Sequence, residues 1–370
     1  MHCLVGTILS MSANADRVAS EILLYCRAGF EADLAAEITT KAAQLGSNGY
    51  PIATANSGFV RYVLADNQPA HTLQKQLAFE TLVFPRQTLV AFPPLAHLDC
   101  EDRISPVMAL IRDSGWSFER ICQEIPDTND GKALTGLGKS IQKALESASR
   151  KCGALRRKAG KRWLHLFWTA GDQVQVAISF PGNRSEYSNG IRHLRFPHDA
   201  PSRSTLKLEE AWHTFIEPAQ WDEVLGDNMW AADLGAAPGG WTWQLVKRGM
   251  NIYAIDNGPM QASLMNTGQV EHLREDAYSW QPPHVLDWLV CDMVDQPARV
   301  TRLMSTWLEK GWTRRAIFNL KLPMKQRWHE VEQCLELLHQ SVERSGQRAH
   351  VRCRHLYHDR EEVTVYVVIV

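Results

Sequence analysis

Two acid–base residues stand at the ends of apolar segments. Asp292 closes D-W-L-V-C-D-M, and Lys321 closes A-I-F-N-L-K-L-P. Open α/β sheets place their active sites at the carboxyl ends of their strands. A lysine at the end of such an apolar strand has a partly desolvated ammonium group, and desolvation lowers its pKa toward the range of a general base. Lys321 is therefore a candidate proton acceptor.

Lys207 and Glu362 are candidates for the same chemistry, each with a plainer alternative. Lys207 lies in S-R-S-T-L-K-L, on a predicted helix, where it can also be a solvated surface lysine. Glu362 precedes V-T-V-Y-V-V, where it can also be a charge that protects an edge strand from aggregation. A second lysine would lower the pKa of Lys321 and the two carboxylates would raise it, so the net direction stays open. The four groups would titrate as a coupled set.

The segment M-W-A-A-D-L-G-A-A-P-G-G-W-T-W predicts a nucleoside site. A buried strand runs into a turn and then a helix, and three glycines let the backbone of that turn approach a ligand: Gly235, Gly239 and Gly240. The spacing is not G-x-G-x-x-G, and Pro238 removes one backbone N–H, so the turn suits a pyrophosphate poorly. S-adenosylmethionine is the common nucleoside cofactor without phosphates.

Two aspartates follow the next predicted strands. Asp256 ends N-I-Y-A-I-D, about 20 residues beyond the turn, where an acid can accept hydrogen bonds from ribose hydroxyls. Asp276, in L-R-E-D-A, can contact the adenine end. A helix cap or solvated loop is the alternative for Asp256, and a surface turn is the alternative for Asp276.

Alternating strands and helices from Ser202 onward predict a mostly parallel sheet with helices on both faces, a Rossmann-like α/β domain. The predicted strands are Met229–Leu234, Asn251–Ile255, Trp288–Cys291, Ala316–Leu320 and Val363–Val370. The predicted helices lie near Ser204–Phe215, Thr242–Arg248, Ala298–Lys310 and Lys325–Gly346.

The upstream half predicts two α+β units. The predicted strands are Ile22–Cys26, Gly58–Leu64, Leu82–Phe92, Trp116–Glu124, Trp163–Trp168 and Gln173–Ser179. The predicted helices are Gly29–Ala43, Leu73–Leu77, Ile104–Asp113 and Thr135–Cys152. We expect an N-terminal extension over residues 1–20, with Met11 as an alternative start, a ferredoxin-like unit over 21–100, a second α+β unit over 101–180, a linker over 181–201 and the Rossmann-like domain over 202–370.

Composition limits the protein class. The 370 residues are 45% apolar and 22% charged, as in soluble globular proteins. No apolar run reaches the ~18 residues that span a bilayer. The apolar segment Cys3–Met11 lacks the basic flank and cleavage site of a signal peptide. The eight cysteines form no C-x-x-C pair, which argues against zinc and disulfide frameworks and for the reducing cytoplasm. We expect no metal and no membrane.

The net charge of −1 means that any signal for nucleic acid must be local. One run of basic residues without acids is a candidate phosphate-binding patch, with a solvated surface as the alternative: Arg150, Lys151, Arg156, Arg157, Lys158, Lys161 and Arg162. A second basic segment, Arg184–Arg195, can guide an RNA strand. Trp241 and Trp243 can stack on a base, although core packing is the commoner role for such residues.

The chain resembles FtsJ-type RNA ribose 2′-O-methyltransferases. Lys207, Asp292, Lys321 and Glu362 match the Lys-Asp-Lys-Glu tetrad of that family, and P-S-R-S-T-L-K-L-E-E, D-L-G-A-A-P-G-G-W, V-C-D-M and R-E-E-V-T-V-Y match its blocks. With N-G-P-M, F-N-L-K-L-P-M-K and L-Y-H-D-R-E-E-V-T-V it is similar to the bacterial branch that methylates a cytidine of large-subunit (23S) rRNA and carries ferredoxin-like and THUMP RNA-binding units.

The resemblance implies S-adenosylmethionine as cofactor, Lys321 as proton acceptor, and large-subunit rRNA as partner, free or in a pre-ribosomal particle. It also implies a cofactor site lined by Ser204, Ala237, Pro238, Gly239, Gly240, Asp256, Asp276 and Asp292. Ala236 stands where some relatives have Cys, and a small residue remains.

The sequence argues against three other functions. A catalytically silent RNA-binding protein would have no need of an intact tetrad, and a nicotinamide-dependent oxidoreductase would need phosphate-binding spacing in the turn. Cys291 lies within a strand and lacks the proline of the P-C motif of cytosine C5 methyltransferases, so we interpret it as a small buried hydrophobe.

Overall fold

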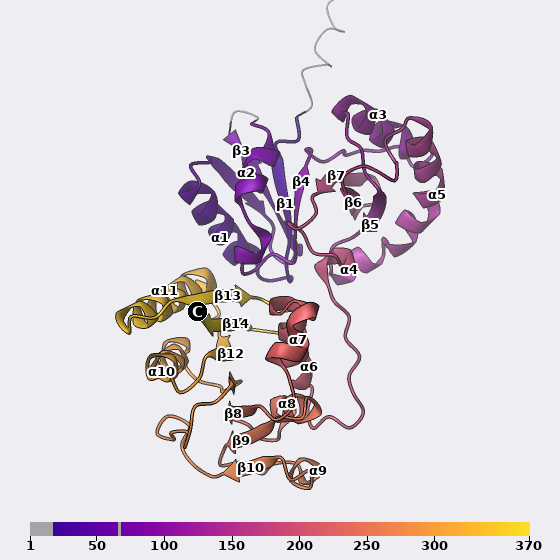
Figure 1. Ribbon diagram of the computed structural model, residues 1–370. Coiled ribbons are helices and arrows are strands. Elements are labelled where there is room, and N and C mark those ends of the chain that lie inside the picture. The colour runs from indigo at the N-terminus through magenta and orange to yellow at the C-terminus, as the bar shows by residue number, and fades with distance from the viewer. Residues whose placement is uncertain (1–17, 66–67) are drawn as a thin grey trace, which may run out of the picture. The chain divides into compact units, whose positions relative to one another are not determined.

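The computed structural model describes residues 18–65 and 68–370, which fall into two compact units (Figure 1). The first unit contains the chain up to Phe79 together with Pro85–Gly190, and the second contains Glu80–Phe84 with Ile191–Val370. Most of the predicted N-terminal extension lies outside the described residues.

The first unit is built on a seven-stranded sheet of order β2-β3-β1-β4-β7-β6-β5. Its strands are β1 Glu21–Tyr25, β2 Gly49–Ala53, β3 Phe59–Leu64, β4 Gln87–Ala91, β5 Arg120–Glu124, β6 Trp163–Ala170 and β7 Gln173–Ser179. Only β5 and β6 pair in parallel among these strands. Strand β4 pairs with β7, so one continuous sheet runs through both predicted α+β units.

Helices α1 and α2 belong to the first half of this sheet, and α3, α4 and α5 to the second (Figure 1). Their bounds are α1 Glu31–Gln44, α2 Ala70–Gln76, α3 Ile104–Ser114, α4 Asn129–Lys132 and α5 Thr135–Lys151. The apolar face of α3, with Val107, Leu110 and Ile111 buried, packs with Leu145 of α5 over the strand residues Leu164 and Leu166.

A buried polar network ties the end of this unit to its sheet. The His165 ring lies 2.8 Å from Glu124 Oε2 and 2.8 Å from Ser179 Oγ, and Glu124 Oε1 accepts the backbone N–H of Asn189. Gln87 Nε2 donates to the Ser185 carbonyl. Part of the predicted linker is therefore held on the first unit.

The second unit is built on a seven-stranded sheet of order β10-β9-β8-β11-β12-β14-β13. Its strands are β8 Trp230–Leu234, β9 Asn251–Ile255, β10 Val270–Leu273, β11 Trp288–Cys291, β12 Arg315–Lys321, β13 Ala349–Arg354 and β14 Glu362–Ile369. The five strands β8 to β12 run parallel, whereas β14 is antiparallel to both of its neighbours. This is the predicted Rossmann-like sheet.

Helices cover both faces of this sheet, with α6 and α8 together on one face and α10 and α11 together on the other (Figure 1). The helices are α6 Thr205–Phe215, α7 Trp221–Val224, α8 Gly240–Lys247, α9 Ala262–Met265, α10 Pro297–Glu309 and α11 Arg327–Arg344. In α10 the buried residues Val300, Leu303, Met304, Trp307 and Leu308 repeat at helical spacing, which fixes the face that meets the sheet.

Three predictions about strands are wrong or incomplete. The predicted strand Leu82–Phe92 begins only at Gln87, because Pro85 interrupts it and the preceding residues belong to the second unit. There the carbonyls of Leu82 and Val83 accept hydrogen bonds from Arg354 and His355. Strand β5 begins at Arg120 rather than at Trp116. The strands β2 and β13 are absent from the prediction, and β10, the strand expected before Asp276, was predicted without bounds.

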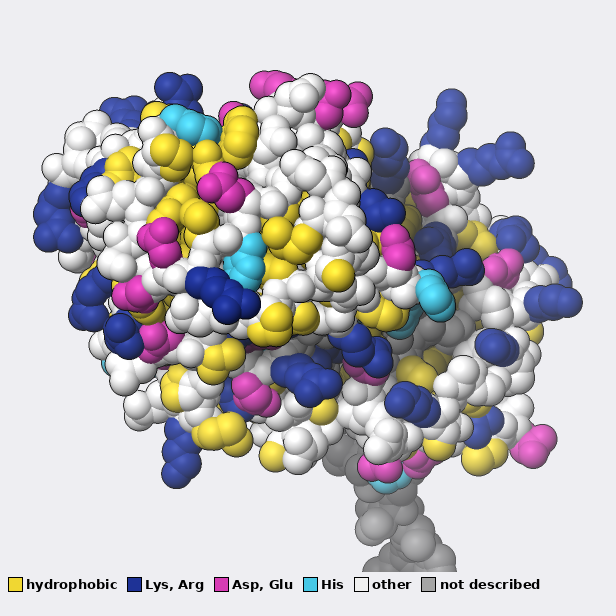
Figure 2. All heavy atoms as spheres, turned by 90° about the horizontal axis from the view of Figure 1, so that it is seen from below, with side chains coloured by type: hydrophobic (Ala, Val, Ile, Leu, Met, Phe, Trp, Pro, Cys, Tyr) yellow, Lys and Arg dark blue, Asp and Glu magenta, His cyan; other side chains and the backbone are white. Residues whose placement is uncertain are grey.

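No helix among the described residues is long and apolar enough to cross a membrane. Figure 2 shows Lys and Arg side chains spread over the face it presents, with Asp and Glu among them. On that face charge alone does not mark one surface for nucleic acid.

Candidate active site

Strand register brings the predicted tetrad together at the carboxyl edge of the second sheet. In the antiparallel β12–β14 ladder, Lys321 pairs directly with Glu362. Strand β11 runs parallel to β12 with Cys291 beside Phe318, so Asp292 leaves the sheet next to the end of β12. Lys207 comes from the first turns of α6, which packs over β14.

Both lysines contact both carboxylates. Lys207 Nζ lies 3.1 Å from Asp292 Oδ2 and 2.6 Å from Glu362 Oε1. Lys321 Nζ lies 2.5 Å from Asp292 Oδ1 and donates a second hydrogen bond to Glu362 Oε2. The arrangement is a closed ring of alternating charges.

The ring is largely removed from water. The exposed fraction of the side chain is 16% for Lys207, 16% for Asp292, 21% for Lys321 and 6% for Glu362. Strand β14 is interior to the sheet, so the edge-strand alternative for Glu362 is wrong. The surface alternative for Lys207 is also wrong, because both carboxylates hold its amine.

The pKa of Lys321 is raised above its ordinary value rather than lowered. Burial lowers the pKa, as the apolar strand predicts, but the charges of Asp292 and Glu362 and their hydrogen bonds raise it by more. The sequence left the net direction of this shift open, and in the structure the two carboxylates outweigh burial, so Lys321 is an ammonium at neutral pH.

Asn319 is a fifth member of the cluster that the sequence analysis missed. Its Nδ2 donates to Asp292 Oδ1 at 3.0 Å and to Glu362 Oε2 at 3.3 Å. The side chain is completely buried. The signal was present in A-I-F-N-L-K, where one amide interrupts an apolar strand two residues before the lysine.

Thr364 and Asp359 support Asn319 from behind. Thr364, which pairs with Asn319 across the ladder, places its Oγ1 2.8 Å from Asn319 Oδ1 and 2.9 Å from Asp359 Oδ2. Asp359 Oδ2 also accepts the backbone N–H of Leu356 at 3.0 Å. Burial raises the pKa of Asp359 well above its usual range, and Glu362 and Glu210 add to this effect.

The glycine-rich turn lies where β8 ends, next to β11. Gly235 and Gly239 adopt φ of +76° and +113°, and the Ala237–Pro238 peptide is cis. A Cβ on Gly239 would stand 2.2 Å from Leu264 Cδ1, and one on Gly240 would stand 2.1 Å from Ser204 Oγ. Glycine is required here both by conformation and by packing.

The structure places the other predicted cofactor residues around this turn or on the neighbouring loops. Asp256 braces the turn, because its Oδ2 accepts the Ala237 N–H at 3.0 Å while its Oδ1 accepts the Gly258 N–H at 2.7 Å. Ser204 lies directly before α6, with its hydroxyl 2.6 Å from that of Ser202. Asp276 is exposed in the loop after β10, where it accepts the Tyr278 N–H. Ligand contacts by these residues stay predictions.

Asp233 is a further acid at this edge that the sequence analysis did not assign. It is buried in β8, and its Oδ2 accepts the hydroxyl of Thr242 at 2.6 Å. Burial raises its pKa to about 7, and the nearby charges of Asp292 and Asp256 also raise it, whereas the hydrogen bond from Thr242 lowers it.

This edge suits a cationic nucleoside. Asp233 lies one residue before the end of β8, Asp256 and Asp292 directly follow β9 and β11, and the ring contributes two lysines. An excess of carboxylates around a tight, glycine-lined turn fits the positive sulfonium of S-adenosylmethionine better than the phosphates of a nicotinamide dinucleotide. No group of His, Cys, Asp or Glu side chains in residues 18–65 and 68–370 has the arrangement of a metal site.

The two tryptophans and the cysteine considered in the sequence analysis are buried. Trp241 and Trp243 are buried in the core, as their commoner role predicts. Cys291 is also fully buried, and burial raises the pKa of its thiol to about 12, which agrees with a small hydrophobe.

The predicted basic run lies at the end of α5 and in the following loop, and most of it is exposed. Arg162 is only partly exposed and binds Ser117 Oγ and the Ala159 carbonyl. The prediction that Arg184 guides RNA is wrong. It is 8% exposed, lies 3.6 Å from the centroid of the Trp163 ring and donates to the Lys161 carbonyl.

Three family models match successive parts of this chain. Residues 19–89 match the RlmM ferredoxin-like domain, residues 102–180 the N-terminal domain of ribosomal RNA large subunit methyltransferase M, and residues 200–343 the FtsJ-like methyltransferase domain.

Relatives from several bacteria carry the name ribosomal RNA large subunit methyltransferase M. The one from Chromohalobacter salexigens is 62% identical, with 94% of this chain and 98% of the relative covered, and the one from Pectobacterium atrosepticum is 48% identical, with 94% and 96% covered. A solved structure, fibrillarin from Aeropyrum pernix with bound S-adenosyl-L-methionine, is 13% identical over 55% of this chain and 81% of its own, with a TM-score of 0.32. The chain therefore belongs to the ribosomal RNA large subunit methyltransferase M family, which is S-adenosylmethionine-dependent and FtsJ-like.

Proposed function

We propose that this chain, a 23S rRNA ribose 2′-O-methyltransferase, uses Lys321 to take the proton from the ribose hydroxyl that it methylates. The observation that carries the assignment is the closed ring of Lys207, Asp292, Lys321 and Glu362 beside the glycine-rich turn. Such a ring holds each of two largely buried amines between two carboxylates at the edge where the fold binds its ligands.

S-adenosylmethionine supplies an electrophilic methyl group. The work left for the protein is to hold the ribose hydroxyl in line and to accept its proton while the oxygen–carbon bond forms. Lys321 Nζ can accept that proton only as a neutral amine. Because Asp292 and Glu362 raise the pKa of Lys321, the amine must first lose its own proton to solvent.

The two carboxylates and Asn319 have a positioning role in this proposal. Asp292 and Glu362 fix the direction of the Lys321 amine from two sides, and Asn319 holds an oxygen of each. Lys207 contacts the second oxygen of each carboxylate and supplies the second positive charge, without which two buried anions would share the single charge of Lys321.

Three finer assignments complete the proposal. The modified nucleoside is a cytidine. The exposed part of the basic run, above all Lys151, Arg157 and Lys158, binds phosphates. The cofactor is contacted by Ser204, Ala237, Pro238, Gly239, Gly240, Asp256, Asp276 and Asp292. The support is the family membership, the exposure of the basic side chains, and the place of the cofactor residues at one sheet edge.

The test is to incubate the purified chain with methyl-labelled S-adenosylmethionine and an unmodified 23S rRNA transcript, and then digest the RNA to nucleosides. We expect the label in 2′-O-methylcytidine alone. Label on a base would contradict ribose chemistry, and label in another 2′-O-methylnucleoside would contradict the cytidine assignment. No transfer to naked RNA but transfer to ribosomal particles from cells lacking the protein would identify assembled RNA as substrate. A silent RNA-binding protein would transfer to neither.

A further inference from the structure

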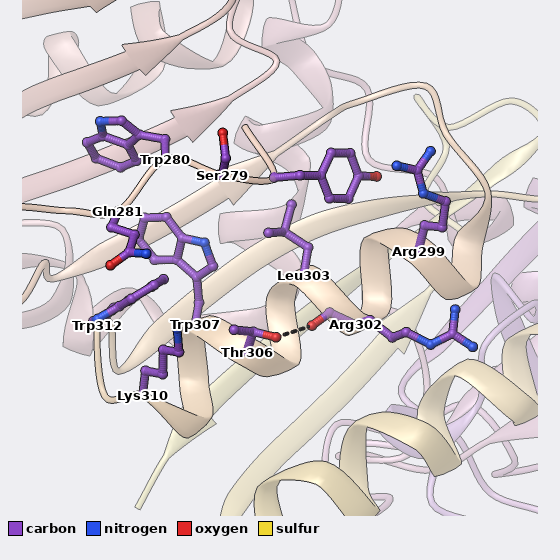
Figure 3. A pocket seen from close by; sticks show the side chains of 11 residues that line it. Ser279, Trp280, Gln281, Arg299, Arg302, Leu303, Thr306, Trp307, Lys310 and Trp312 are labelled. Carbon is purple, nitrogen blue, oxygen red and sulfur yellow. Dashed lines mark hydrogen bonds between the residues drawn. The ribbon is translucent and has the colours of Figure 1, made fainter. Parts of the chain in front are cut away.

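We propose that the groove between α10 and the β10–β11 connection binds the sugar–phosphate backbone of the substrate RNA, beside the catalytic edge. This inference rests on the proposed function, since it extends the substrate path of the same site. The groove is a cavity of about 620 Å³ on the second unit, and Figure 3 shows the side chains that line it.

The groove is cationic. Its lining contains Arg299, Arg302 and Lys310, all exposed, and no aspartate or glutamate. Arg302 and Lys310 form no ion pair within residues 18–65 and 68–370. A surface that keeps two unpaired cations and has no acid in its own lining attracts anions, and this one lies in a chain whose net charge is −1.

The floor of the groove is aromatic. Figure 3 shows the indoles of Trp280, Trp307 and Trp312 gathered at one end and the guanidinium groups of Arg299 and Arg302 at the other. Trp307 is fully buried, and Trp312 is partly exposed with Lys310 Nζ 4.4 Å from the centroid of its ring. The Trp312 ring keeps water away from one side of the Lys310 ammonium, which strengthens its attraction for phosphate.

The Arg299 guanidinium is held in place by neighbouring side chains. Asp295 Oδ2 accepts hydrogen bonds from Arg299 Nη1 at 2.9 Å and from the Tyr278 hydroxyl at 2.8 Å, and the guanidinium lies 4.5 Å from the centroid of the Tyr278 ring. The side chain is therefore held in place at one end of the groove, and ordering it on binding costs little entropy.

The groove starts at the catalytic edge. Asp295 follows the tetrad residue Asp292 by three positions, and Tyr278 follows Asp276 by two, so both belong to loops at the carboxyl ends of β10 and β11. From Arg299 to Lys310 the cations follow α10 over about 16 Å at 1.5 Å per residue. One phosphate group cannot contact both ends. A strand with successive phosphates can, which favours a polynucleotide over a free anion or mononucleotide.

A second cavity of about 560 Å³ shares Arg302 and Thr306 with the first and reaches Arg344 of α11. Its lining contains one acid, Glu309, which holds the Ser341 hydroxyl. The cationic path therefore continues from the groove across the α10–α11 surface, which gives a strand room to leave the active site.

The test compares the double variant Arg302→Glu/Lys310→Glu with Arg348→Glu, which reverses a charge on the exposed loop before β13, outside the groove. Steady-state methyl transfer to an unmodified 23S rRNA transcript gives kcat and KM over a range of salt, calorimetry with S-adenosylhomocysteine reports the cofactor site, and thermal melts report folding. We expect KM for RNA to rise about tenfold or more in the double variant, with kcat, cofactor affinity and melting close to wild type.

Binding of a fluorescent fragment of the transcript should also lose salt dependence. Each phosphate contact to a single strand contributes about 0.7 to the log–log slope, so two lost contacts reduce it by about 1.4. Equal KM and equal slope in the double variant and Arg348→Glu would overturn the proposal. Loss of adenosine 5′-monophosphate binding with unchanged RNA kinetics would also overturn it, because it identifies a mononucleotide site. If the wild type transfers no methyl group at all, the proposed function fails. Binding of the RNA fragment by the same variants then still shows whether the groove binds RNA.

Discussion

Thr364 lies directly across the β12–β14 ladder from Asn319, and its Oγ1 stands 2.8 Å from Asn319 Oδ1. The same hydroxyl stands 2.9 Å from Asp359 Oδ2. A hydroxyl has one proton to donate, so one of these two contacts needs a proton from the other partner. Only Asp359 can supply it, as a neutral carboxylic acid, which agrees with the raised pKa of this buried group. The hydrogen bonds that link Asp359 to Thr364 and Thr364 to Asn319 therefore direct the Asn319 amide at the tetrad carboxylates.

Replacing Thr364 with Val should slow methyl transfer without weakening cofactor binding. The substitution leaves Asn319 Oδ1 without its partner in a buried site, which costs about 1–3 kcal/mol, and it frees the amide to turn away from Asp292 and Glu362. We expect kcat to fall about tenfold and the affinity for S-adenosylhomocysteine to stay unchanged.

Thr364→Ser is the matched control, because it keeps the hydroxyl and should keep most of kcat. Rate measurements with both variants at saturating RNA separate a positioning role from simple destabilisation. Equal rates for the Val variant and the wild type would show that Asn319 holds the carboxylates without help from Thr364.

Lys321→Ala should abolish methyl transfer while leaving S-adenosylhomocysteine affinity nearly unchanged, since the amine contacts the carboxylates and the proton it accepts. The loss should be at least ~100-fold, the usual contribution of a positioned general base. Single-turnover rates test the loss of methyl transfer, and calorimetry tests the affinity for S-adenosylhomocysteine. Retained turnover would remove Lys321 from the chemistry.

The pH profile of the wild type tests the same role. Since the pKa of Lys321 is raised above 10.5, the neutral amine is a small fraction at pH 7 and grows tenfold with each pH unit. We expect kcat to rise with unit slope between about pH 7 and pH 9. A profile that is flat over this range would mean that another group accepts the proton.

The fold of the second unit could be predicted from the sequence because its strands are apolar runs separated by amphipathic helices. Strand β13 could not, since A-H-V-R-C-R places His350 and Arg352 on an edge strand and has the composition of a loop. The four tetrad positions were predictable as strand and helix ends. Their contacts depend on the register between β12 and β14, which pairs Asn319 with a residue 45 positions away.

The same limit explains why the direction of the Lys321 pKa shift stayed open in the sequence. The sequence shows the apolar strand that lowers this pKa, but only the structure shows that two carboxylates contact one amine and reverse the shift. It also explains Arg184, whose side chain is buried over the Trp163 ring although the sequence around it is polar. Charge and polarity were visible in the sequence, whereas partners across the fold were not.

Gly239→Ala should destabilise the turn and weaken cofactor binding together. The residue has φ of +113°, which strains any side chain, and an added Cβ would stand 2.2 Å from Leu264 Cδ1, so the Leu264 side chain or the turn must shift. We expect a loss of about 1–3 kcal/mol in the free energy of unfolding. Gly268→Ala is the control, because φ is also positive there but nothing lies within 4 Å of the added carbon. S-adenosylhomocysteine affinity should fall only in the Gly239 variant. Equal affinity in both variants would show that the shape of the turn does not matter to the cofactor.

Asp233→Asn should stabilise the protein at alkaline pH. Burial raises the pKa of Asp233 to about 7 from an unfolded value near 3.8, so between about pH 4 and pH 7 the folded state keeps a proton that the unfolded chain has lost. Stability therefore falls as pH rises through this window, by at most about 1.4 kcal/mol per pH unit for one proton. Asparagine keeps an oxygen to accept the Thr242 hydroxyl and carries no charge, so the variant lacks this decline. Urea unfolding at pH 5, 6, 7 and 8 measures the difference between variant and wild type, which should grow with pH up to about 7 and then stay level. A difference that is constant from pH 5 to pH 8 would mean that Asp233 is ionised in the folded protein throughout, and that the lysine pair of the tetrad offsets its burial.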